Sequence, residues 1–137
     1  MINSFQILHA DFINIKDGYP QINFKKFITR IMPRINWYCD FDKIDIGLCR
    51  QFPKEYRDIK KEFFLKHGYS ATLHIEQLLF FQEYVGVNGP QYHTLNDPVY
   101  VVHCNDGYVL WEGYHRIFQK ILSGVINIDA KILEIPI

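Results

Sequence analysis

The chain has 137 residues, with 15 Lys and Arg against 15 Asp and Glu, so its formal net charge is zero. A neutral protein lacks the broad positive field that drives non-specific binding to nucleic acid, so such binding is not favoured. Hydrophobic residues make up 48% of the chain, far more than a disordered segment tolerates. The length fits a single domain over residues 1–137 with a sizeable core.

The three cysteines, Cys39, Cys49 and Cys104, are odd in number and include no Cys-x-x-Cys pair. Such usage predicts reduced thiols rather than a disulfide framework. The start of the chain has no basic segment before a long apolar run, and no stretch approaches the roughly 18 uninterrupted apolar residues of a membrane helix. The sequence therefore predicts a cytoplasmic protein with no membrane partner.

The first third of the chain predicts a strand, a turn and a helix. Residues 5–9 have strand character, and Asp17-Gly-Tyr-Pro20 has the chemistry of a turn. Asn23 is a candidate N-cap for a helix that runs to about Ile31, because the apolar residues after it recur at helical spacing. Pro33 should end that helix.

The middle third contains the clearest upstream helix. Pro53 is of a type favoured at the first helical position, apolar residues repeat at helical spacing after it, and Gly68 follows the last turn as a stop. Residues 69–75 are open to two interpretations, a strand or the approach to a helix over Glu76–Tyr84. Residues 86–96, rich in Gly, Pro and Asn, predict a loop.

The last third shows the strongest patterns. Pro98–Cys104 and Tyr108–Trp111 are rich in β-branched and aromatic residues, and Asn105-Asp-Gly107 between them is a strong hairpin signal. The helical spacing that follows ends at Gly124, a candidate C′ residue. Residues 126–135 alternate apolar and polar over much of their length, which predicts a half-buried strand.

The segment Gly113-Tyr-His-Arg116 joins the predicted hairpin to the predicted helix. A helix N-terminus presents unpaired backbone N–H groups and the positive end of the helix dipole. A glycine lets an anion approach the backbone closely, and His115 and Arg116 add charge-assisted donors. The segment therefore predicts a phosphate-binding turn. The competing interpretation is an ordinary helix start with a surface His and Arg.

The C-terminal segment, residues 97–137, resembles the core of the ParB/sulfiredoxin superfamily. The resemblance is carried by Asp97-Pro-Val-Tyr-Val101, Asp106-Gly-Tyr108, Glu112-Gly-Tyr-His-Arg-Ile117, Gly124 and Ile128-Asp-Ala-Lys-Ile132. It implies an α+β fold in which a small mixed β-sheet has helices packed on one side. In that superfamily the turn binds nucleotide phosphates, of ATP or CTP according to the member.

The resemblance implies that the phosphates contact Gly113, Tyr114, His115 and Arg116. Tyr114 stands at the position of the catalytic cysteine of sulfiredoxin, so sulfinic-acid reduction is not expected. His115 and Arg116 are expected to neutralise charge on a transferred phosphoryl group. Lys120, one turn into the helix, is either a further phosphate ligand or a solvated surface lysine.

Glu112, the last residue before the turn, has two open roles. It is a candidate to position Mg²⁺ or to act as a base, or it pairs with Arg116 and orients it. No metal site is predicted from His103 and Cys104, because adjacent strand residues point to opposite faces of a sheet.

The leading functional hypothesis is a nucleotide-binding phosphotransferase or nucleotide hydrolase that uses ATP or CTP, with Mg²⁺ and an acceptor that the sequence does not identify. The alternative is a non-enzymatic protein-interaction module of the toxin–antitoxin, mobile-element or anti-defence type. ParB-like DNA binding or nuclease activity is a third hypothesis. The neutral charge of the chain disfavours DNA binding, and the sequence shows no clear metal-binding carboxylate cluster for a nuclease. The aromatic residues predicted to form a protein interface are Tyr19, Trp37, Tyr38, Tyr84 and Tyr92.

Overall fold

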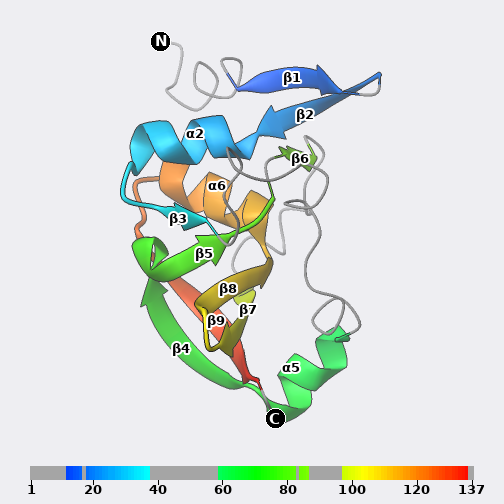
Figure 1. The fold of residues 1–137 in the computed structure, drawn as a ribbon, viewed down its shortest axis with the longest axis vertical. Helices are drawn as coiled ribbons and strands as arrows, with labels where there is room; N and C mark the ends of the chain where they lie inside the picture. Colours follow the sequence, from blue (N-terminus) through cyan, green and yellow to red (C-terminus); the bar gives the residue numbers. More distant parts are fainter. Residues whose placement is uncertain (1–11, 17, 38–58, 83, 87–96, 136–137) are drawn as a thin grey trace.

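The structure is a computed structural model that describes residues 12–16, 18–37, 59–82, 84–86 and 97–135. Within these ranges the helices are α2 (Phe24–Ile31), α5 (Lys61–His67) and α6 (Tyr114–Leu122), with a 3₁₀ turn at Ile75–Gln77. The strands are β1 (Ile13–Lys16), β2 (Tyr19–Asn23), β3 (Asn36–Trp37), β4 (Tyr69–His74), β5 (Leu78–Phe80), β6 (Tyr84–Gly86), β7 (Val99–Cys104), β8 (Gly107–Glu112) and β9 (Asn127–Glu134). This content confirms the predicted α+β class (Figure 1).

The strands form two sheets. The larger has the order β3-β5-β8-β7-β9-β4, and the smaller has the order β1-β2-β6. The larger sheet is mixed, because β7 runs antiparallel to β8 but parallel to β9, and β5 is parallel to both β3 and β8. β4 is the strand at one edge of this sheet, and it pairs antiparallel with β9.

The C-terminal order of hairpin, helix and strand is confirmed. The turn between β7 and β8 needs Gly107, whose φ of +127° is disfavoured for other residues. α6 follows Gly113 directly, and Gly124 after its end adopts a φ of +81°. β9 alternates buried and exposed side chains over its first half, as a half-buried strand should.

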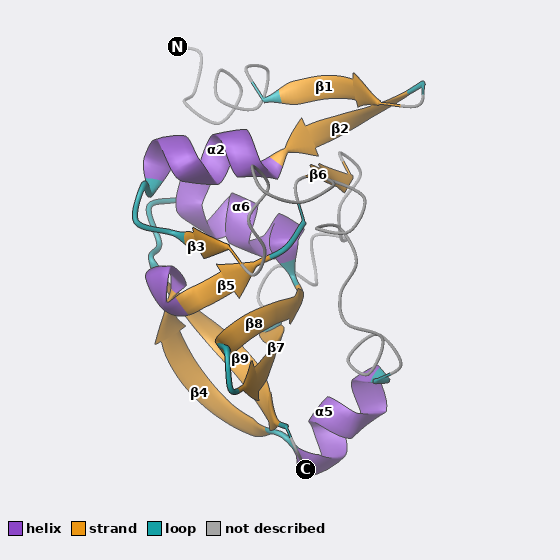
Figure 2. Ribbon diagram, in the orientation of Figure 1, coloured by secondary structure: helices purple, strands orange, loops and turns teal. Residues whose placement is uncertain are grey.

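The predicted helix after Asn23 is also confirmed. The Asn23 side chain accepts a hydrogen bond from the backbone N–H of Lys26 at 2.9 Å, so Asn23 is the N-cap of α2. Phe27 on the buried face of α2 packs against Phe118 of α6 with ring centroids 4.5 Å apart. Figure 2 shows α2 lying along α6, with the β1–β2 hairpin beyond it.

Helices cover both faces of the larger sheet, so the prediction that they pack on one side is wrong. Val99 and Tyr100 are consecutive in β7 and therefore point to opposite faces. Gly113 at the start of α6 lies against Val99, whereas Phe64 of α5 packs against Tyr100 at 5.3 Å. An apolar residue at nearly every position of β7 is what a strand covered on both faces requires.

The predicted helix over Glu76–Tyr84 does not form. The 3₁₀ turn is followed instead by β5 and, after residue 83, by β6. Leu78 and Phe80 of β5 are fully buried, and pairing with β8 satisfies backbone groups that a helix would have bonded internally. Residues 69–74 form β4, so of the two interpretations of residues 69–75 the strand is correct.

Several predicted features fall outside the part of the chain that the structure describes. They are the strand at 5–9, the start of the helix at Pro53 and most of the loop at 86–96. A helix that runs unbroken from Pro53 does not form, because Ile59 and Lys60 are not helical and Lys60 is an extended N-cap residue. α5 begins only at Lys61, and it ends before Gly68 as predicted. Within the described ranges, no helix has the length and apolar character needed to cross a membrane.

Candidate functional site

The start of α6 has the geometry of an uncapped helix N-terminus. Gly113 is the N-cap residue, with φ +123° and ψ 19°, and it offers no side-chain acceptor to the first turn. The first turn also contains no acidic residue. The helical ladder begins with the N–H of Ile117 bonded to the carbonyl of Gly113 at 2.9 Å. The N–H groups of residues 114–116 precede that bond, and these are the groups that bind anions at helix starts.

Gly113 is required by the packing of the helix against the sheet. A Cβ atom at this position would lie 2.5 Å from Val99 Cγ1 and 2.8 Å from Val99 Cβ. Its positive φ is a second reason for glycine. The side of Gly113 that faces Val99 is therefore filled, and a ligand at this turn must approach from the side of the N–H groups.

The side chain of Tyr114 belongs to the core. It is 4% exposed, and its ring contacts Phe24 at 5.2 Å in an edge-to-face arrangement. Its hydroxyl accepts a hydrogen bond from the backbone N–H of Phe81 at 2.8 Å and donates to the carbonyl of Leu110 at 3.4 Å. Tyr114 therefore anchors the start of α6, and its side chain is occupied by the core.

Arg116 is buried although it carries a charge. Its side chain is 6% exposed, and Nη1 donates a hydrogen bond to the carbonyl of Pro98 at 2.7 Å. Its Nε is also buried and has no hydrogen-bond partner among the residues that the structure describes. The predicted alternative of a Glu112–Arg116 ion pair does not form, since the guanidinium turns to Pro98 instead. The helix start thus holds a desolvated cation with no carboxylate bonded to it within the described chain.

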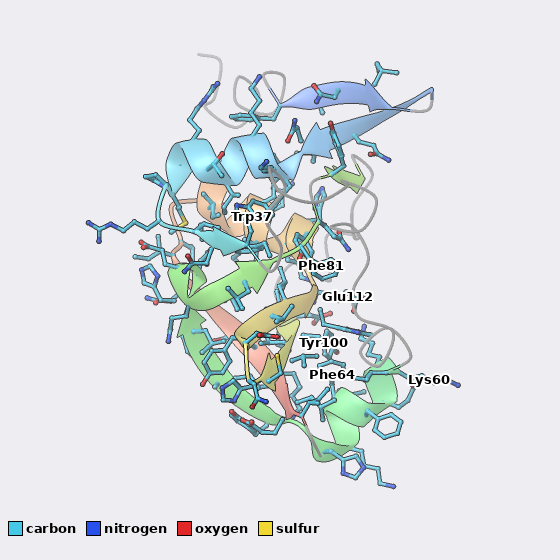
Figure 3. All side chains as sticks on the ribbon, viewed as in Figure 1. Trp37, Lys60, Phe64, Phe81, Tyr100 and Glu112 are labelled. Carbon is cyan, nitrogen blue, oxygen red and sulfur yellow. The ribbon has the colours of Figure 1, made fainter. Side chains whose placement is uncertain are left out.

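The other predicted site residues are Glu112, His115 and Lys120, and they differ in exposure and in position relative to this turn. Glu112 is exposed at the end of β8, where Figure 3 labels it. His115 is half-buried, with its ring centroid 6.1 Å from that of Phe118. Lys120 is in the last turn of α6, about 10 Å along the axis from Gly113 at the usual helical rise. Lys120 therefore lies toward the negative end of the helix dipole.

A second polar group, which the sequence analysis did not predict, lies at the opposite end of the β7–β8 hairpin. His103 Nδ1 is 2.8 and 2.9 Å from the two carboxylate oxygens of Glu134, and the Tyr69 hydroxyl donates to Glu134 at 2.7 Å. Tyr108 stacks on His103 with ring centroids 4.1 Å apart. Strand register brings these residues together, and no motif in the sequence announces it.

The hydrogen bonds in this group shift two pKa values. The bond to the Glu134 carboxylate, with a smaller effect of burial, raises the pKa of Tyr69 to about 12. The pKa of Glu134 is lowered by its hydrogen bond with His103 and then by that from Tyr69. The described residues contain no cluster of three or more His, Cys, Asp or Glu able to hold a metal ion.

The aromatic residues predicted to form a protein interface are only partly visible. Trp37 is half-buried against Phe80, with ring centroids 5.9 Å apart, and Tyr84 is half-buried as well. Tyr38, Tyr92 and the side chain of Tyr19 lie outside the description. Exposed apolar side chains occur elsewhere, on α5 and β4: Phe63 is 45% exposed, Leu65 62% and Tyr69 43%.

The structure therefore brings together the main chain of residues 113–116 and the buried side chain of Arg116, with Glu112 exposed next to the turn. It leaves Lys120 at the other end of the helix. Comparison of the chain with protein-family models, with curated proteins and with solved structures found no match.

Proposed function

We propose that the start of α6 binds the phosphates of a nucleotide, ATP or CTP, and that the protein is a phosphotransferase or nucleotide hydrolase. The observation that carries this proposal is Arg116, a buried cation whose Nε has no hydrogen-bond partner among the described residues. Burying a charge without a counter-ion is costly. A phosphate at this turn would supply the opposite charge and the missing acceptor.

The turn offers a phosphate three kinds of stabilisation. Main-chain N–H groups of residues 114–116 donate hydrogen bonds, and the helix dipole adds positive potential at the same place. The Arg116 guanidinium offsets negative charge, the main requirement of phosphoryl transfer. Glu112, exposed at the end of β8, is the candidate to hold Mg²⁺ or the acceptor. The C-terminal resemblance to ParB/sulfiredoxin proteins supports the same assignment.

The proposal is tested by thermal unfolding with ATP, ADP, CTP and GTP, each with and without Mg²⁺. A nucleotide at 100 times its Kd should stabilise the protein by about 2.7 kcal/mol. Arg116→Ala should weaken binding by about 1.5–3 kcal/mol, the scale of a charge-assisted hydrogen bond. The matched control is Lys120→Ala, which removes a cation from the last turn of the same helix and should leave binding unchanged.

Arg116 also bonds the carbonyl of Pro98, so its replacement affects folding as well as binding. Each variant is therefore compared with its own ligand-free melting temperature, and Kd is measured by calorimetry on the folded fraction. A Glu112→Gln variant tests the magnesium assignment, because it should reduce only the Mg²⁺-dependent part of the shift. The absence of any shift with all four nucleotides would refute the proposal.

A second candidate function is the binding of a protein partner without catalysis. The exposed side chains Phe63 and Leu65 on α5 favour it, because each leaves apolar surface that a partner protein could cover. Mutations at the two sites distinguish the two candidate functions. Phe63→Ser with Leu65→Ser should abolish partner binding and leave nucleotide binding intact, whereas Arg116→Ala should do the reverse.

A further inference from the structure

The outer edge of β4 carries main-chain groups whose direction can be deduced. β4 pairs with β9 from Tyr69 opposite Ile132 to His74 opposite Asn127. The next pair in this register is bonded, because the N–H of Ile75 donates to the carbonyl of Ile126 at 2.8 Å. Hydrogen-bonded pairs alternate along an antiparallel ladder. The residues of β4 that bond β9 are therefore Tyr69, Ala71 and Leu73, and those that direct their N–H and C=O outward are Ser70, Thr72 and His74.

Among the described residues, one of these three outward positions has a hydrogen-bond partner for its N–H group and two have none. The N–H of His74 donates to the Gln77 side chain at 2.7 Å, which ends the strand. Ser70 and Thr72 have no main-chain hydrogen bond on the outer side within the described residues. Edge strands are normally protected by a charge, a proline or a bulge, and residues 69–73 contain none of these.

The open segment has a symmetric pattern of side chains. Tyr69-Ser-Ala-Thr-Leu73 reads as large apolar, hydroxyl, small, hydroxyl, large apolar in either direction about Ala71. A two-fold interface needs complementary positions about its axis, and the order of residue types has that property, with Tyr69 exposed at one end and Leu73 buried at the other. Binding of a peptide with a different sequence would not require this symmetry, so the pattern favours a second copy of the chain as the partner.

We propose that β4 pairs antiparallel with β4 of a second copy of the chain, with Ala71 opposite Ala71 on the two-fold axis. Ser70 of each copy then lies opposite Thr72 of the other, and the open N–H and C=O groups at these positions all form hydrogen bonds. The residues on the axis form a non-hydrogen-bonded pair with Cα atoms about 4.5 Å apart, which the small side chain of alanine permits. Tyr69 then lies opposite Leu73 of the copy as a cross-strand pair, with Leu73 buried in the core of its own chain.

Charge and shape both allow this pairing. Residues 69–73 carry no charge, and the whole chain has zero formal net charge, so two copies do not repel each other strongly. In Figure 1, β4 forms the outer margin of the larger sheet and α5 runs away from that margin. The two larger sheets become one continuous sheet across the interface.

The first test is the oligomeric state of the parent and of two variants at one position. Thr72→Pro removes the outward N–H and places a ring at the edge, a position where proline is tolerated because it donates nothing to β9. Thr72→Val is the matched control, since it keeps the N–H. Sedimentation equilibrium from about 1 to about 200 µM should show dimers of the parent and of Thr72→Val, and monomers of Thr72→Pro. A parent that stays monomeric, or a Thr72→Pro dimer as tight as the parent, overturns the proposal.

Hydrogen exchange on the parent tests the same interface without any variant. The Ser70 and Thr72 amides should exchange at least about tenfold more slowly at the high concentration than at the low one. The Ala71 amide points to β9 and should be protected at both. A dimer in which the Ser70 and Thr72 amides exchange freely places the interface elsewhere and refutes the pairing.

Discussion

Gly113 lies directly against Val99, so closely that a Cβ atom on the glycine would come within 2.5 Å of Val99 Cγ1. The contact joins the first residue before α6 to the first residue of β7. The glycine that marks the phosphate-binding turn in the sequence is therefore also the residue that lets the helix dock on the sheet. Its role in the fold does not depend on a ligand.

Replacing Gly113 by alanine should destabilise the protein by about 3 kcal/mol or more, because it adds both backbone strain and an overpacked contact. Gly124→Ala is the matched control. Gly124 also has a positive φ, but a Cβ there would meet nothing within 4 Å. Its replacement should cost only the strain, about 1 kcal/mol. Denaturant unfolding measures both, and equal losses would contradict the contact with Val99.

Tyr114→Phe should destabilise the fold by about 1–3 kcal/mol, because the buried N–H of Phe81 loses the hydroxyl that accepts its hydrogen bond. Tyr69→Phe removes a hydroxyl from an exposed side chain and should change the free energy of unfolding by no more than about 0.5 kcal/mol. Chemical denaturation of the two variants checks the difference. A neutral Tyr114→Phe would show that the hydroxyl does not hold α6 in place.

Phe64→Ala should cost about 3–5 kcal/mol, since Phe64 is fully buried against Tyr100 and Trp111. Its neighbour Phe63 is 45% exposed, so Phe63→Ala should have an effect of at most about 0.5 kcal/mol. The comparison, made by thermal unfolding, tests whether α5 covers the second face of the larger sheet. Similar costs for the two variants would contradict that arrangement.

The carboxyl of Glu134 should titrate below its ordinary value of 4.5 in the folded protein, because His103 and then Tyr69 hydrogen-bond its charged form. A lowered folded pKa means that the stabilisation is present above the unfolded pKa and is lost as the pH falls through the folded one. Tyr69, with its pKa raised from 10.0 to about 12, behaves in the opposite sense and loses its contribution between those two values as the pH rises.

NMR titration of the Glu134 carboxyl carbon measures this shift. His103→Ala should raise the pKa of Glu134 toward 4.5, and Tyr69→Phe should raise it by a smaller amount, following the order of the two causes. A parent protein whose Glu134 titrates at its ordinary value would contradict the hydrogen bonds at 2.7–2.9 Å.

Local signals in the sequence predicted most of the C-terminal fold. Alternating apolar residues, an Asn-Asp-Gly turn and a glycine after the helix fix β7, β8, α6 and the start of β9, because each signal acts within a few residues. The same kind of signal predicted Asn23 as the N-cap of α2. Local signals failed at Glu76–Tyr84, where pairing with β8 outweighs a weak helical preference.

The sequence predicted where the candidate site lies in the chain, but it did not predict the burial and contacts of the side chains at that site. The order of strand, glycine and helix identified the turn at Gly113–Arg116, and the structure has a helix N-terminus there. The sequence did not show that Arg116 is buried on Pro98, or that Tyr114 faces the core. It also gave no sign of the group formed by His103, Glu134 and Tyr69, which exists only because β7, β9 and β4 are neighbours.

The sequence by itself determined where strands and helices begin and end in the last third of the chain, because caps, turns and periodicity depend on neighbouring residues. Only the tertiary structure decided what each side chain meets. Arg116 bonds a carbonyl 18 residues earlier and Tyr114 bonds an amide 33 residues earlier. Such partners depend on the order of strands in the larger sheet, and that order is set by the packing of the whole core.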